Sequence, residues 1–182
     1  MINITSLMQV KAFARQDGAL LALLWIASFA SIVWMPQSMA GSLLAIATPF
    51  FVGWRLKKFR DYALEGLISF RRGYAYSVYT FIYAALLFAL VQFLYFRYLD
   101  HGTFTAMIEG TIQVMIPVYE QSGVSVEELK SMLTTVRELS PVEWSFTFMM
   151  QNLFIGAVLS LPIAAIAMRR RLTQGGTGTQ QQ

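Results

Sequence analysis

The chain has a single histidine, and an acid precedes it, as Asp100-His101. A His-Asp pair can relay protons or contribute to a metal site, but metal sites need three or four converging ligands. The sequence contains no cysteine and no HxxxH, HExxH or GxSxG spacing. Asp100 followed by Gly102 is typical of a turn. We therefore interpret the pair as part of a loop and expect a protein that is not an enzyme and holds neither metal nor cofactor.

Three amide side chains interrupt otherwise apolar stretches. Gln92 lies five residues before Arg97, and Gln151 and Asn152 lie seven and eight residues after Trp144. At a rise of about 1.5 Å per residue, two helices would place these amides at similar depth in a membrane. Amides at one depth can hydrogen-bond to one another and hold helices together, or they can line a polar cavity. Both interpretations stay open.

Two further stripes recur at helical spacing. Tyr76, Tyr79 and Tyr83 form a hydroxyl-bearing face, which is typical of aromatic anchors at a membrane interface and could also line a substrate path. Small residues occur at every fourth position of the last apolar stretch, at Gly156, Ser160 and Ala164. Such a smooth face predicts close packing of this helix against another backbone.

Basic residues gather in one segment, 55–76, where they alternate with aromatic and aliphatic side chains. This pattern is typical of a segment that lies on anionic lipid headgroups. The candidate headgroup-binding residues are Arg55, Lys57, Lys58, Arg60, Arg71 and Arg72. The pI of 9.5 reflects the orientation of the chain in a membrane, and no nucleic-acid partner is expected.

Four apolar runs without Asp, Glu, Lys or Arg must position these residues: 18–35, 41–54, 77–96 and 145–168. A membrane-spanning helix needs about 20 apolar residues. The chain is 56% hydrophobic, with a mean hydropathy of +0.52, which is too apolar for an ordinary soluble domain. We predict an all-α membrane protein with four transmembrane helices, at about 18–35, 39–54, 76–97 and 145–168.

The remaining segments complete a single membrane domain over residues 1–172. Residues 6–17 place apolar side chains on one helical face, which predicts an interfacial helix before the first span. A small extracytoplasmic region of helices is expected at about 103–138, between the third and fourth spans. Residues 173–182 have no apolar side chain to bury and should be disordered. A signal peptide ending near Ala40 is the rival interpretation of the N-terminus, but the apolar run is longer than such peptides need.

The charges predict the orientation. The N-terminal segment, the 55–76 loop and the C-terminal tail together carry a net charge of +8, whereas residues 97–144 carry −4. Short basic loops stay on the cytoplasmic side of a membrane. Both termini are therefore expected inside, with the region between the third and fourth spans outside.

The chain resembles the bacterial integral-membrane proteins grouped as domain of unknown function 4199. The resemblance runs through the motifs at 59–61 and 65–70, the span that ends at 95–100, the acidic outer helices and Leu139-Ser140-Pro141. It implies a multi-pass protein of the bacterial cytoplasmic (inner) membrane with no assigned activity.

Two functional hypotheses follow. The first is a non-enzymatic accessory or scaffold subunit, whose helical faces bind a membrane-protein partner or a second copy of the chain. The alternative is a small oligomeric transporter or lipid-handling protein with an intramembrane cavity lined by Gln92, Gln151 and Asn152. If those amides met across a closed, dry interface, the second hypothesis would fail.

Overall fold

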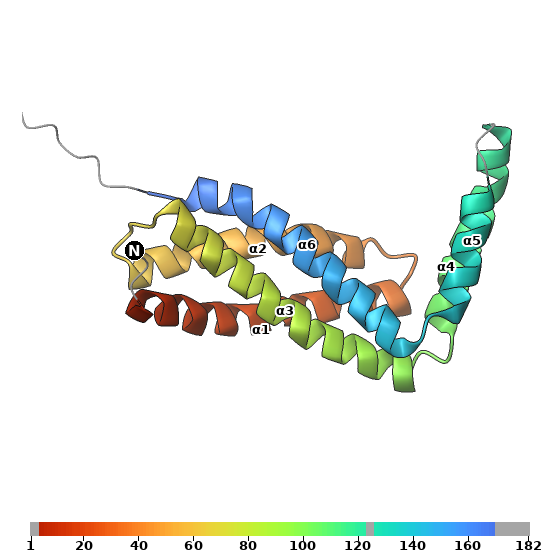
Figure 1. Cartoon of the computed structure of the whole chain (residues 1–182), viewed down its shortest axis with the longest axis horizontal. Coiled ribbons are helices and arrows are strands. Elements are labelled where there is room, and N and C mark those ends of the chain that lie inside the picture. Colours follow the sequence, from red (N-terminus) through yellow and green to blue (C-terminus); the bar gives the residue numbers. More distant parts are fainter. Residues whose placement is uncertain (1–3, 123–125, 170–182) are drawn as a thin grey trace, which may run out of the picture.

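The protein is all-α in the computed structural model, which describes residues 4–122 and 126–169 (Figure 1). Within these residues there is no β-strand, so the all-α part of the predicted fold class is confirmed. Two backbone hydrogen bonds form an isolated bridge between Ile68 and Arg169. The six helices are α1 (Ile4–Trp34), α2 (Ala40–Ala63), α3 (Phe70–Tyr98), α4 (Thr103–Gln121), α5 (Glu127–Glu138) and α6 (Pro141–Ala167).

Four of the helices form a lengthwise bundle, and α4 and α5 form a hairpin across one end of it (Figure 1). Helix α3 packs against both α1 and α6. Helices α1 and α2 run antiparallel, since Ser28 donates to the carbonyl of Gly41 (2.7 Å) and Trp25 donates to Thr48 (3.0 Å). The chain thus returns along α2 to the end from which α1 started.

Three helices, not four, are long and apolar enough to cross a membrane among the residues described: Met8–Trp34, Phe70–Tyr98 and Pro141–Ala167. The prediction of four such helices is corrected at α2. A helix does cover the expected span 39–54, but it continues to Ala63. Its last nine residues include five charged ones, Arg55, Lys57, Lys58, Arg60 and Asp61, which lower its hydropathy.

The predicted interfacial helix at 6–17 is not a separate element, because α1 runs without a break from Ile4 to Trp34. The expected apolar face exists, but protein covers part of it: Val10 and Ala14 are buried, and the Phe13 ring lies 5.1 Å from that of Phe59. Gly18 does not end the helix. A Cβ there would lie 2.8 Å from the carbonyl oxygen of Thr80, so this glycine permits close contact with α3.

The region expected at 103–138 holds α4 and α5. Arg137 of α5 donates two hydrogen bonds, of 3.0 and 3.1 Å, to Glu109 of α4 and so joins the two helices. Arg137 holds the pKa of the Glu109 carboxyl below its usual range, so the pair stays ionised at neutral pH. Its stabilisation is lost as the pH falls through that lowered pKa. Helix α6 begins with a capping box formed by Ser140 and Glu143. The tail 173–182 lies outside the described residues.

The small-residue face of α6 packs against α3 within the same chain. Gly156 lies against the Phe81 ring, Ala164 lies against Gly73, and all four of these residues are buried. A Cβ built on Gly156 would lie 2.5 Å from a carbon of that ring. The α3–α6 contact therefore depends on the missing side chain.

Replacing Gly156 with alanine should destabilise the protein by about 1–3 kcal/mol, because the added methyl group overpacks the interface with Phe81. Gly53→Ala is the matched control, since a Cβ at Gly53 meets nothing within 4 Å. Alanine favours a helix over glycine by about 1 kcal/mol, so the control should be neutral or stabilising. Thermal unfolding of the detergent-purified variants would measure both. An equal or higher melting temperature for Gly156→Ala would contradict the tight contact.

Candidate functional site

A cavity of about 400 Å³ lies among the four bundle helices. All three predicted amides, Gln92 of α3 and Gln151 and Asn152 of α6, line it. Helix α1 contributes Trp25 and Ser28 among others, and α2 contributes Ala45 and Thr48. The structure therefore brings the predicted polar cluster together around an open space, and no hydrogen bond between these amides is present.

Gln92 is the polar side chain of the cavity with the least exposure, at 1%. Its Oε1 accepts no hydrogen bond, and it is the one buried side-chain nitrogen or oxygen in this state among the residues described. Leaving such a group unsatisfied costs about 1–3 kcal/mol. An occupant that donates a hydrogen bond would remove this cost, so the amide favours a ligand with a polar group at this depth.

Apart from Ser28 and Thr48, the rest of the lining is apolar or aromatic. It includes Trp25, Phe29, Phe81, Phe88 and Phe148, and none of the lining residues is charged. Cavities of about 300–1,000 Å³ with few polar groups are typical of small-molecule sites. An ionised group placed here would have no counter-charge, so the cavity suits the uncharged part of a ligand.

Packed side chains fill the bundle on the α1 N-terminal side of the cavity. Trp25 hydrogen-bonds to Thr48, and its ring contacts Phe81 and Phe88 at centroid distances of 6.1 and 5.7 Å. Beyond it, Leu21 and Val52 are fully buried. The cavity therefore does not continue as a pore toward the α2–α3 loop.

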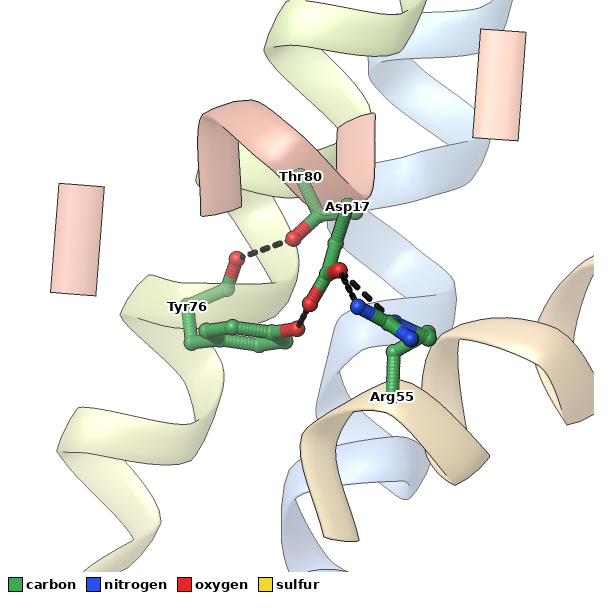
Figure 2. A network of polar contacts seen from close by, with 4 residues as sticks. All are labelled: Asp17, Arg55, Tyr76 and Thr80. Carbon is green, nitrogen blue, oxygen red and sulfur yellow. Dashed lines mark hydrogen bonds and ion pairs between the residues drawn. The ribbon is translucent and has the colours of Figure 1, made fainter. Parts of the chain in front are cut away.

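A network of charged and hydroxyl groups lies beyond this packed layer (Figure 2). The Asp17 carboxylate accepts hydrogen bonds from Arg55, through Nε at 2.7 Å and through Nη2, and from the Tyr76 hydroxyl. The side chains of Asp17 and Arg55 are 3% and 17% exposed. One carboxylate thus joins α1, α2 and α3.

Tyr76 is held in place through both its ring and its backbone. Its ring stacks on Phe59 of α2 at a centroid distance of 4.8 Å, and Thr80 donates to its backbone carbonyl at 2.9 Å (Figure 2). It is fully buried. Of the predicted tyrosine stripe, Tyr79 and Tyr83 are only partly buried, and Lys11 lies 5.3 Å from the centroid of the Tyr79 ring.

The candidate headgroup-binding residues fall into two groups. Arg55 is engaged by Asp17, and Arg60 is 5% exposed and donates to Asp61 and to the carbonyl of Ala167. By contrast, the side chains of Lys57, Lys58 and Arg71 are exposed, and that of Arg72 is partly exposed. Lys58 lies over the Trp54 ring, 4.7 Å from its centroid. Contact with lipid headgroups stays a prediction for the second group.

The Asp100-His101 pair forms the turn that was expected. Asp100 is buried and accepts hydrogen bonds from the Tyr95 hydroxyl (2.9 Å) and from the backbone of Gly102 and Phe104. His101 is exposed, with a φ of 45°. No group of three His, Asp or Glu residues that could hold a metal occurs in the part of the chain that is described.

The sequence reasoning missed the Asp17 network. Asp17 was counted as a charge before the first span, and Tyr76 was treated as an interfacial ring. One signal was present, since Asp17 directly precedes an apolar run and Arg55 directly follows one. Both charges therefore stand at the same membrane boundary when the two runs form a hairpin.

Asp17→Asn should destabilise the protein by about 3 kcal/mol, at the lower end of the range for breaking a buried pair because Arg55 keeps some contact with solvent. Asp17→Asn combined with Arg55→Gln should recover part of this loss, since no unpaired charge then remains. Glu120→Gln is the control: Glu120 is exposed on α4, and the loss of its charge should change stability by no more than about 0.5 kcal/mol. Chemical unfolding in detergent would measure these variants together with Arg55→Gln alone, which completes the double-mutant cycle. Additive losses for Asp17 and Arg55 would show that they are not coupled.

Comparison with known proteins identifies a family but no activity. A family model described as "Protein of unknown function (DUF4199)" matches residues 16–169. No curated protein matches the chain, and no solved structure does. The matched region contains the cavity, the Asp17 network and the α4–α5 hairpin. The chain belongs to the DUF4199 family of proteins of unknown function.

Proposed function

We propose that this protein is a lipid-handling membrane protein that takes an uncharged portion of a membrane lipid into the cavity between its bundle helices. The unsatisfied amide oxygen of Gln92, buried at a cavity that Gln151 and Asn152 also line, supports this proposal most directly. The aromatic lining would hold an acyl chain, and the Gln92 Oε1 would accept a hydrogen bond from a hydroxyl or amide N–H group next to it.

The accessory or scaffold hypothesis has less support. It relied on smooth helical faces that a partner could cover, but Gly156, Ser160 and Ala164 already pack inside the chain. Oligomerisation remains part of the lipid-handling proposal, because the packed layer below Trp25 leaves no pathway through one copy. The proposal includes no catalytic step.

We further propose that the protein resides in a bacterial inner membrane with both termini in the cytoplasm. Its three apolar helices indicate a multi-pass membrane protein. Helix α2 would return the chain through the membrane as the partner of α1, with Arg55 and Arg60 neutralised by Asp17 and Asp61. The +8 and −4 segments supply the orientation.

Lipid entry into the cavity can be measured at Trp25, which lines it and is one of four tryptophans. In a background with Trp34, Trp54 and Trp144 changed to Phe, brominated acyl chains in vesicles should quench Trp25 fluorescence. Ala45→Phe adds a ring at the cavity wall and should remove most of this quenching. Ala27→Phe is the matched control, because Ala27 is exposed on α1 and does not line the cavity.

Quenching that is absent in the parent, or unchanged by Ala45→Phe, would contradict the proposal. Gln92→Leu tests the polar contact separately. It should leave acyl quenching in place but weaken retention of lipid through detergent purification, measured by mass spectrometry of the extracted lipids. Equal lipid retention by Gln92→Leu would show that the amide does not bind the ligand.

Orientation can be tested with single cysteines, because the chain has none. We expect a membrane-impermeant thiol reagent applied to intact cells to label Ser131→Cys, on the acidic hairpin, and not Gln180→Cys, in the C-terminal tail. Permeabilised cells should label both, which controls for reactivity. Labelling of Gln180→Cys alone in intact cells would reverse the orientation.

A further inference from the structure

Helix α4 leaves the bundle with one of its faces against the bundle's aromatic cluster. Phe104, in its first turn, is buried, and its ring lies 5.3 Å from that of Phe96 and 5.4 Å from that of Trp144. The Asp100 turn fixes this start, since Asp100 accepts a hydrogen bond from the Phe104 backbone at 2.8 Å. From there the helix runs across the end of the bundle and past its edge (Figure 1).

The face that begins at Phe104 can be followed along α4. With about 100° between successive residues, positions 104, 108, 111, 115 and 118 point to one side of the helix. We call Phe104, Ile108, Thr111, Met115 and Val118 the α4 stripe. It contains no charged residue.

The exposure of the α4 stripe rises as the helix moves away from the bundle. Phe104 is 7% exposed, and Ile108 is partly buried against the aromatic cluster. Farther out, Met115 is 37% exposed and Val118 is 60% exposed, with the neighbouring Val114 at 73%. A face that the bundle covers at its start therefore has no protein cover within the described chain at its far end.

The opposite side of α4 is polar. Glu109, Gln113 and Glu120 lie more than a third of a turn from the centre of the stripe, on the basis of the same helical spacing. Glu109 pairs with Arg137, which places α5 on that side of α4. Helix α5 buries its own apolar residues Val126 and Leu129. The hairpin thus has a polar side and an uncharged apolar side.

The apolar side of the hairpin faces the end of the bundle, which is where the bundle would meet the membrane surface. Large side chains are exposed at this end of the bundle, at Trp34 (72%), Tyr98 (65%) and Leu99 (65%). Exposed aromatic rings at helix ends are typical of the membrane interface. The five glutamates of α4 and α5 exceed their two basic residues, so a zwitterionic lipid surface suits the hairpin better than an anionic one.

We propose that α4 is an interfacial helix that lies in the headgroup region of the leaflet at this end of the bundle, with Met115 and Val118 in contact with lipid chains. The occupant of the apolar face is then the zwitterionic lipid surface in which the bundle itself sits. This proposal does not depend on the lipid-binding cavity.

Nitroxide labels at single cysteines would test the placement in the full-length chain reconstituted into phosphatidylcholine vesicles. Val118→Cys samples the stripe, and Gln113→Cys is the matched control on the opposite side of the same helix. We expect the ratio of collisions with oxygen to collisions with a water-soluble nickel chelate to be several-fold higher at 118 than at 113. Both reagents must be present on both sides of the membrane.

A scan of labels from 111 to 121 extends the test beyond one variant. The oxygen-to-nickel ratio should be highest at 111, 115 and 118, following the helical period. Equal, high nickel accessibility at 118 and 113 would mean that the hairpin projects into water and would overturn the proposal. Shielding of position 118 from both reagents would also overturn it, because a protein partner or second copy would then cover the stripe.

Discussion

The Asp17 carboxylate is the contact on which the arrangement of the bundle depends, because it accepts hydrogen bonds from two other helices at once. A carboxylate removed from water needs such donors. Arg55 supplies them from α2 and Tyr76 from α3. The neighbouring Gly18 lets α1 approach the backbone of α3 closely enough for this contact. The network also explains how the charged part of α2 can belong to the bundle. The charges make α2 too polar to count as an apolar span, but Asp17 neutralises Arg55 where α2 meets α1.

The position of this contact determines where space is left. Near the network, buried side chains such as Leu56 and Phe59 fill the bundle. Toward the end of the bundle that carries α4 and α5, hydrogen bonds from Ser28 to Gly41 and from Trp25 to Thr48 join α1 to α2. At this level the cavity opens among all four helices. We infer that α2 follows α1 rather than α6, which leaves room beside the aromatic side chains of α3 and α6. The cavity therefore results from the hydrogen bonds that hold α2 against α1.

The sequence predicted what depends on local pattern and depth. Apolar run length predicted α1, α3 and α6, and equal depth predicted one polar cluster of Gln92, Gln151 and Asn152, which line one cavity. It could not predict which helices approach most closely, since that depends on side-chain contacts between distant residues. For this reason the Asp17 network was missed, and Arg55 was counted with the candidate headgroup-binding residues.

Near each end of α3 a tyrosine hydroxyl donates a hydrogen bond to an aspartate, and the polar residues between these ends behave differently. Near one end the Tyr76 hydroxyl donates to Asp17, and near the other the Tyr95 hydroxyl donates to Asp100. Between these pairs, Ser77 and Thr80 satisfy their hydroxyls on backbone carbonyls. Gln92 alone, among the buried side chains described, leaves an oxygen unsatisfied, and it does so at the cavity. A chain that pairs its other buried polar groups so consistently retains this amide at a cost in stability, and a ligand that binds there would offset that cost.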